Sequence, residues 1–189
     1  MHELSHFRDL AEDPEKMMQN FEYIREQAKK TGAKMIEKWE AKYGATDPEF
    51  IENMKKQKPM SKKNPTKTMN AVERAAYKIH HTFYNVFDDI YVNNLVARKA
   101  PKYEAEEKGG VEVKKLYREK LFAGSDYAQL PRHLQFLYKL IREEMVSDEE
   151  AGVSDEVKEV MKREIKFLGE HTPKEAVDRF LKPKTGRDT

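Results

Sequence analysis

The sequence predicts an all-α fold, a helical bundle with an extended N-terminal helical arm. Apolar residues recur at spacings of three and four along most of the chain, and helix start and stop signals flank these stretches. No segment shows the alternation of apolar and polar residues, rich in β-branched side chains, that is typical of strands. Charged residues make up 37% of the 189 residues and hydrophobic residues 38%, so polar surface is plentiful relative to core, which favours an elongated helical shape.

Two helices are expected in the N-terminal arm. Residues 13–15, Asp-Pro-Glu, combine an N-cap, a proline at the first helical position and an acid in the first turn. This helix should end at Gly44, and Thr31-Gly32 are expected to break or kink it. Residues 46–49, Thr-Asp-Pro-Glu, repeat the start signal and predict a short second helix.

A loop and then a long helix are expected next. Residues 57–68 carry two prolines, a serine and an asparagine among lysines, which indicates a breaker-rich loop. The long helix should begin near Asn70 and end at residues 100–101, Ala-Pro, a length of roughly 40 Å at about 1.5 Å per residue. Its apolar residues alternate between spacings of four and three, as in a heptad. This 72–90 seam consists of Val72, Ala76, Ile79, Phe83, Val86 and Ile90.

Four shorter helices are expected in the rest of the chain. They carry residues 113–121, residues 134–145 after Pro131, residues 154–169 between a serine N-cap and a glycine, and a last helix opened by the capping-box pattern Thr-Pro-Lys-Glu at 172–175. The domain organisation predicted is an N-terminal helical arm with a basic loop (1–68), a helical bundle core (69–182) and a flexible tail (183–189).

The sequence lacks the signatures of several classes of protein. No stretch approaches the roughly 20 apolar residues that cross a bilayer, and the first residues show no secretory signal. The absence of cysteine excludes disulfides, thiolate metal sites and a thiol nucleophile, and it fits an intracellular or hot environment. Abundant lysine and glutamate favour a thermophile.

Two histidine patterns in the sequence have both a metal-site interpretation and a simpler one. Residues 2–6, His-Glu-Leu-Ser-His, match the H-E-x-x-H pattern of zinc hydrolases, in which two histidines four apart bind the metal. The simpler interpretation is a polar N-terminal turn with its apolar residues packed inward. His80 and His81 are adjacent and point about 100° apart on a helix, so they are unsuited to one metal ion. The sequence therefore predicts no enzymatic activity, catalytic residue, metal or cofactor, with a metal-dependent hydrolase using His2 and His6 as an alternative.

Charge is unevenly distributed along the chain. From Asn53 to Asn70 there are six lysines and no acid, whereas residues 143–164 contain nine acids and three bases. Opposite patches on one chain allow head-to-tail assembly between copies. The alternative is that the acidic stretch is a solvated loop and helix face.

The basic segment is the strongest functional signal. Lysine is a point charge suited to phosphate oxygens, and binding would release condensed counterions. Lysines upstream extend the positive charge along the first helix, with Trp39 and Tyr43 between them. Because arginines, which read guanine well, are few here, the contacts expected are to the backbone and independent of sequence. A solvated surface and an acidic protein partner are the alternatives.

The layout of residues 14–100 resembles the major capsid proteins of filamentous and rod-shaped double-stranded-DNA archaeal viruses, of the lipothrixvirus and rudivirus kind. The resemblance consists of a basic helical region with embedded aromatics (36–43, Ile-Glu-Lys-Trp-Glu-Ala-Lys-Tyr), a Lys/Pro/Asn segment and a helical bundle. It implies an N-terminal helix-turn-helix arm, and identical or paralogous subunits that pair, wrap A-form DNA and stack into a filament, sometimes beneath a lipid envelope. The DNA-contacting residues it implies are Lys29, Lys30, Lys34, Lys38, Lys42, Lys55, Lys56, Lys58, Lys62, Lys63 and Lys67.

The function expected from these observations is that of a virion coat protein that packages double-stranded DNA in a helical filament. Its partners would be DNA and a second coat subunit, either itself or a paralogue. The alternative is a cytoplasmic all-helical interaction or regulatory module that binds a protein through the 72–90 seam.

Overall fold

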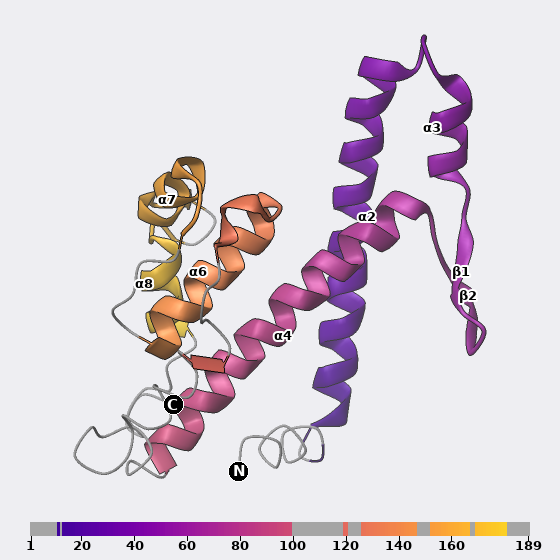
Figure 1. Cartoon of the computed structure of the whole chain (residues 1–189). Helices are drawn as coiled ribbons and strands as arrows, with labels where there is room; N and C mark the ends of the chain where they lie inside the picture. The colour runs from indigo at the N-terminus through magenta and orange to yellow at the C-terminus, as the bar shows by residue number, and fades with distance from the viewer. Residues whose placement is uncertain are drawn as a thin grey trace. The chain divides into compact units, whose positions relative to one another are not determined.

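The computed structural model of the chain describes residues 11, 13–99, 119–120, 126–146, 152–166 and 169–180. In these ranges the protein is mostly helical, with one small two-stranded sheet, so the predicted all-α class is confirmed (Figure 1). The chain divides into two compact units, and the boundary falls between Asn85 and Val86. Among the described helices, none combines the length and the apolarity that crossing a bilayer requires.

Helix α2, Pro14–Tyr43, begins as the sequence predicts, because the Asp13 side chain accepts a hydrogen bond from the Lys16 N–H (2.9 Å). The helix is continuous, so the predicted break at Thr31-Gly32 is wrong. Gly32 is buried where α2 meets the N-terminal end of helix α4, and a side chain there would collide with Glu73. The glycine therefore serves a close helix–helix contact, which offsets its low helix propensity.

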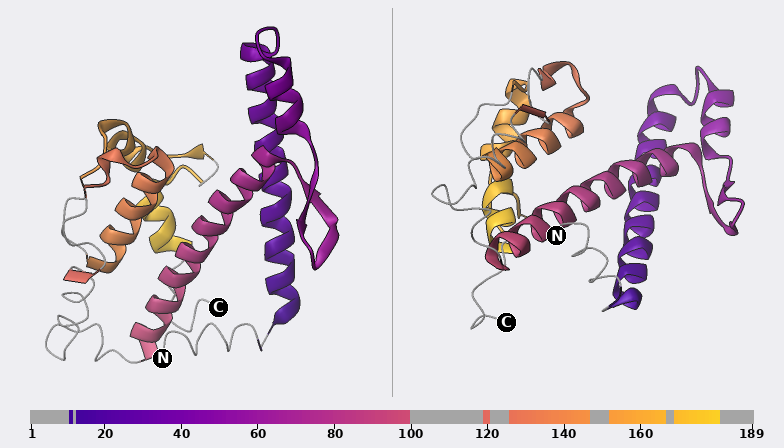
Figure 2. Two further views of the ribbon diagram at one scale, coloured as in Figure 1. Left: turned by 45° about the vertical axis from the view of Figure 1, so that its right-hand side comes forward. Right: turned by 60° about the horizontal axis from the view of Figure 1, so that its bottom comes forward.

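Helix α3, Pro48–Lys55, follows a short turn and returns along α2. Its N-cap is Asp47, whose carboxylate accepts from the Phe50 N–H (3.0 Å), as the start signal predicts. The Phe50 ring lies 5.9 Å from the Trp39 ring, measured between centroids. These contacts fix α3 beside the C-terminal part of α2 (Figures 1 and 2).

Residues 57–68 were predicted to be a loop, and this is wrong. Strands β1 (Lys58–Ser61) and β2 (Asn64–Met69) form an antiparallel hairpin. The register shifts between Pro59 and Ser61, where one residue of β1 faces three residues of β2 that include Pro65, and such a bulge tolerates a residue without an N–H. The hairpin is held by tertiary packing, since Met69 is completely buried together with Ala28 of α2 and Ala76 of α4. Burial of this kind overrides a weak local strand propensity.

Helix α4, Ala71–Lys99, confirms the long helix expected after residue 70. Asn70 and Glu73 form a capping box: Asn70 Oδ1 accepts from the Glu73 N–H (2.8 Å), and Glu73 Oε2 accepts from the Asn70 N–H (2.7 Å). The first turns of α4 belong to the unit that contains α2, α3 and the hairpin, called here the N-terminal unit. The remainder of α4 belongs to the second unit.

The second unit contains the short 3-10 helix η3 (Tyr127–Gln129) and helices α6 (Arg132–Val146), α7 (Asp155–Lys162) and α8 (Pro173–Phe180). Gln135 of α6 joins the segment before α6 to the segment before α7 through hydrogen bonds. Gln135 Nε2 donates to the carbonyls of Ala128 (3.1 Å) and Leu130 (2.7 Å), and Gln135 Oε1 accepts from the Ser154 N–H (2.8 Å). The buried residues of its core are Ile90, Tyr127, Leu140, Val153, Val157, Met161 and Val177.

Two helix predictions in the second unit have different outcomes. The helix expected over 154–169 ends at Lys162, because Arg163 is extended and the Ile165 N–H donates to the His171 carbonyl (3.0 Å). The capping box at 172–175 is confirmed by the Thr172 N–H, which donates to Glu175 Oε2 (2.8 Å). Apart from residues 119–120, the helix expected over 113–121 lies outside the described residues, as does the predicted tail.

Candidate nucleic-acid interface

All eleven lysines predicted to contact DNA lie in the N-terminal unit. Lys29, Lys30, Lys34, Lys38 and Lys42 are on α2, Lys55 ends α3, Lys56 follows it, and Lys58, Lys62, Lys63 and Lys67 are on the hairpin. Residues 13–85 contain fifteen lysines and arginines and ten acids, a net charge of +5. The structure divides these lysines into groups with different surroundings.

Three lysines of the hairpin are exposed in a segment that contains no acid. Lys62 and Lys63 form its two-residue tip, where the Asn64 N–H donates to the Ser61 hydroxyl (3.2 Å). These two side chains and that of Lys58 are exposed, and among the described residues no carboxylate forms an ion pair with them. The tip is therefore a local concentration of free positive charge.

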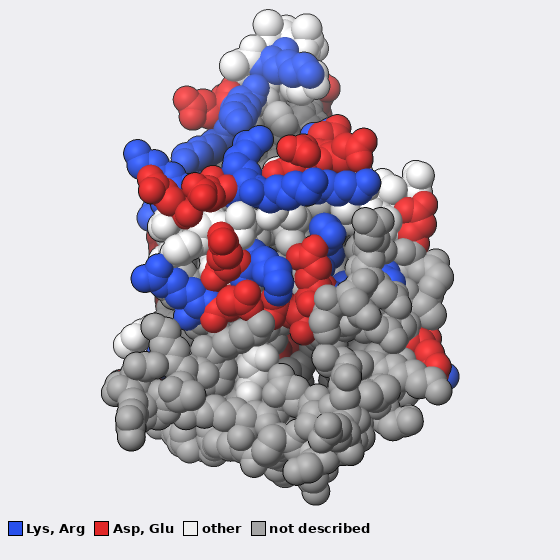
Figure 3. Space-filling model, turned by 90° about the vertical axis from the view of Figure 1, so that its left-hand side faces the viewer, with Lys and Arg blue, Asp and Glu red and all other residues white. Residues whose placement is uncertain are grey.

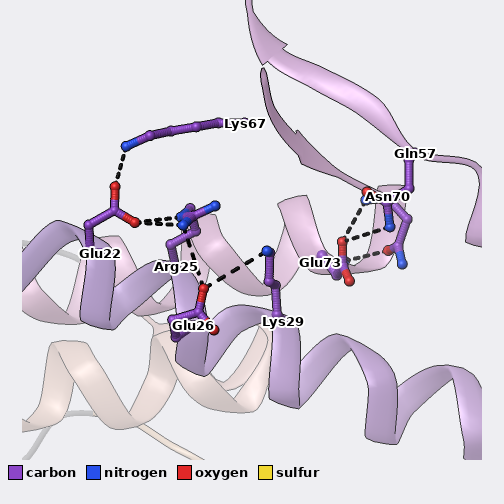
Figure 4. Close-up of polar contacts among 8 residues, drawn as sticks. All are labelled: Glu22, Arg25, Glu26, Lys29, Gln57, Lys67, Asn70 and Glu73. Atoms are coloured by element: carbon purple, nitrogen blue, oxygen red, sulfur yellow. Dashed lines mark hydrogen bonds and ion pairs between the residues drawn. The ribbon is translucent and has the colours of Figure 1, made fainter. Parts of the chain in front are cut away.

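Lys67 and Lys55 are occupied within the protein. Lys67 forms an ion pair with Glu22 of α2, and Arg25 binds the same carboxylate at 2.7 Å (Figure 4). The hydrogen bond from Lys67 is the main cause that lowers the pKa of Glu22, Arg25 adds to it, and burial opposes both. Lys55 pairs in the same way with Glu40. These two lysines join the hairpin and α3 to α2, a role that the sequence did not reveal.

The α2 lysines lie on a mixed surface. Lys30, Lys34 and Lys38 are exposed and four residues apart, away from the buried stripe of the helix. Glu37 and Glu40 flank Lys38, and Lys29 lies 3.9 Å from Glu26. Lys42 lies over its neighbour's aromatic ring, 5.0 Å from the Tyr43 centroid. Figure 3 shows one face of the molecule, on which Lys and Arg are interspersed with Asp and Glu.

The acidic stretch 143–164 is partly neutralised inside the second unit. Glu143 pairs with Lys139 (2.7 Å), Glu144 with Lys174 (2.9 Å) and Glu156 with Arg132 (3.0 Å). The Glu144 side chain is only 3% exposed. For these acids the structure favours an intramolecular role over pairing with a neighbouring copy, and residues 147–151 lie outside the described ranges.

The two adjacent histidines of α4 contact side chains of α2. His80 Nε2 lies 3.2 Å from the Thr31 hydroxyl, and burial lowers the pKa of His80. The His81 ring stacks on Phe21 with centroids 5.7 Å apart. In the ranges the structure covers, no three metal-binding side chains gather. The His-Glu-Leu-Ser-His match at 2–6 lies outside these ranges.

Comparison with known proteins adds no relative: no family model, curated protein or solved structure matches this chain. The likeness to viral capsid proteins stays a prediction from the layout of the sequence.

Proposed function

We propose that this protein is a non-enzymatic structural protein that binds and packages double-stranded DNA through lysine–phosphate contacts. The observation that carries the proposal is the hairpin tip, where Lys62 and Lys63, with Lys58 in the adjoining strand, are exposed and have no carboxylate partner among the described residues. Each such lysine can replace condensed cations on DNA, and release of these ions drives binding.

The shape of the lysine hairpin supports double-stranded DNA as the partner. A two-stranded β-ribbon has the dimensions that the major groove of DNA admits. The segment from Asn53 to Asn70 contains lysine but no arginine, so it lacks the side chain best suited to bidentate guanine contacts. Binding would therefore follow the phosphate backbone and ignore base sequence.

The coat-protein part of the proposal rests on the layout of residues 14–100. A basic helix with embedded aromatics is followed by a Lys/Pro/Asn segment and a long helix, and the resemblance to the capsid proteins rests on this order. We propose that copies of this chain, or this chain and a paralogous subunit, pair around DNA and stack into a virion filament. A lipid envelope around that filament would be an additional layer.

The test is DNA affinity as a function of salt, followed by electron microscopy. If about six phosphates are neutralised, the logarithm of the association constant should fall against log salt with a slope near −5 on a random-sequence duplex. Affinity that does not change between low and high salt would exclude lysine–phosphate binding. Regular filaments that form only with DNA would support the coat role, and DNA binding without filaments would leave only the packaging role.

The structure gives less support to an interaction module that uses the 72–90 seam. Val72 and Ala76 are buried within the N-terminal unit, and Ile90 is buried within the second unit, each at most 3% exposed. The other three seam residues are half-buried, so the protein's own packing uses half of the seam completely.

A further inference from the structure

A cavity of about 320 Å³ lies inside the N-terminal unit, between α2, the hairpin and α4. Its lining combines aromatic rings with charged groups and is separate from the exposed lysines at the hairpin tip. This volume is within the range of small-molecule sites, and such sites join apolar walls to a few placed polar groups.

Part of the cavity lining is aromatic. Phe21 of α2 and His81 of α4 are stacked with an interplanar angle of 16°, and the Tyr77 ring lies 5.8 Å from His81. Met60 of β1 adds a polarisable thioether beside them. Surfaces of this kind favour flat aromatic ligands, and stacking on them tolerates any nucleobase because every base has a π-face.

The lining also contains charged groups. Glu22, Arg25 and Lys67 line the cavity together, and Asn64 of β2 adds an amide. Arg25 also lies 3.6 Å from Glu26, but lysine has three donors and arginine five, so Glu22 and Glu26 together do not use all the donors of the two cations. Donors remaining on Arg25 and Lys67 can therefore bind an anionic group that enters the cavity (Figure 4).

We propose that this cavity binds a nucleotide, with its base against Phe21, Tyr77 and His81 and its phosphate at Arg25 and Lys67. The shared chemistry of the ligand is a nucleobase joined to a phosphate, supplied by a free nucleotide or by an unstacked nucleotide of a single strand. The site goes beyond the proposed packaging function, since it does not use Lys58, Lys62 or Lys63 and a stacked duplex does not offer its bases to it.

The first experiment titrates the full chain with guanosine monophosphate and adenosine monophosphate, by calorimetry and proton NMR. Stacking in the cavity should shift the base protons upfield. Inorganic phosphate alone should bind at least about tenfold more weakly, because it cannot stack on the aromatic residues. Guanosine alone should bind more weakly by at least the same factor, because it has no phosphate for Arg25 and Lys67. A single-stranded decamer, compared with the mononucleotides, distinguishes the two sources. Absence of saturable binding, or equal binding of inorganic phosphate, would overturn the proposal.

The second experiment locates the site. Lys67→Met and Phe21→Leu should each weaken mononucleotide binding at least about tenfold. Lys62→Met removes one charge at the hairpin tip, outside the cavity, and should leave it unchanged. Equal weakening by Lys62→Met would place binding elsewhere and overturn the proposal. Circular dichroism shows whether each cavity variant folds. If one does not, the upfield shifts of the base protons with the wild-type chain test the proposal. If only the packaging proposal is wrong, the protein will not bind duplex DNA but will still bind nucleotides.

Discussion

Gly32 of α2 lies against the backbone of Glu73 at the start of α4. A Cβ atom on Gly32 would stand 3.0 Å from both the N and Cα atoms of Glu73, closer than the roughly 3.5–4.0 Å of favourable contacts. The capping box with Asn70 holds that part of α4 in place. The contact between α2 and α4 in the N-terminal unit therefore requires a residue without a side chain.

Substituting Gly32→Ala should destabilise the protein. Overpacking costs about 1–3 kcal/mol, and the better helix propensity of alanine returns at most about 1 kcal/mol. Urea denaturation measures the free energy of unfolding. The control is Ala33→Leu on the exposed face of α2, which should change it by no more than about 0.5 kcal/mol. A more stable Gly32→Ala variant would contradict the close contact.

Loss of the Asn70 cap should lower stability through α4. Asn70 is 5% exposed, and its side chain satisfies the Glu73 N–H, so Asn70→Ala should cost about 1–2 kcal/mol. Asn70→Asp keeps an acceptor at the same place and should retain most of the stability. Thermal unfolding followed by circular dichroism compares the two. Equal loss in both variants would show that capping is not the cause.

The Glu22–Lys67 pair should make stability depend on pH. The pKa of Glu22 is lowered from 4.5 in the folded state, so the pair stabilises the protein fully above pH 4.5, and this contribution is lost as the pH falls through the folded-state pKa. Because both side chains are more than a third exposed, the contribution should be about 0.2–1 kcal/mol. Glu22→Gln should remove it at neutral pH and flatten the stability curve below pH 4.5.

The matched control for that pH experiment is Glu52→Gln. Glu52 is exposed on α3, and no ion pair joins it to another described residue. Its substitution should leave the stability curve almost unchanged. If both substitutions flatten the curve equally, the pH dependence does not come from the pair with Lys67.

Gln135 should be essential to the second unit. Gln135→Leu leaves the Ala128 and Leu130 carbonyls and the Ser154 N–H without their partner, and because these hydrogen bonds are part-buried each loss should cost about 1 kcal/mol, the lower end of the range for buried groups. We expect a loss of about 3 kcal/mol or more in the free energy of unfolding. Gln129→Leu, on the exposed side of η3, is the control and should be nearly neutral. A mild effect of Gln135→Leu would mean that water replaces the side chain.

The hairpin tip should set part of the salt dependence of DNA binding. Replacing Lys62 and Lys63 together with glutamine removes two phosphate contacts and should make the slope of log affinity against log salt shallower by about 2. Lys16→Gln with Lys78→Gln removes the same charge from exposed positions on α2 and α4 and is the control. An equal change in both pairs would show that net charge, and not the hairpin, governs binding.

Helix boundaries were the most predictable part of the fold because they depend on local chemistry. Asp13 and Asp47, each before a proline, cap α2 and α3 as expected. The hairpin could not be predicted, because its stability comes from residues distant in sequence. Met69 is buried together with Ala28 and Ala76, and no local pattern in the sequence indicates that burial.

The candidate site could be predicted only as a set of lysines. The sequence alone does not distinguish these lysines from one another. In the structure some of them form ion pairs with glutamates far along the chain, and others do not. Glu22 lies 45 residues from Lys67, and Glu40 lies 15 residues from Lys55. Such pairings depend on the tertiary fold, so composition alone overestimates the free charge.

The prolines of the hairpin have a consequence for how closely copies of this chain can be packed. In the described part of the chain the sheet has two strands, so each strand has one open edge, and open edges invite strand addition and aggregation. Pro59 and Pro65 offer no N–H to an incoming strand, and the neighbouring lysines repel an identical edge. The hairpin is thereby protected against amyloid-like association at high protein concentration.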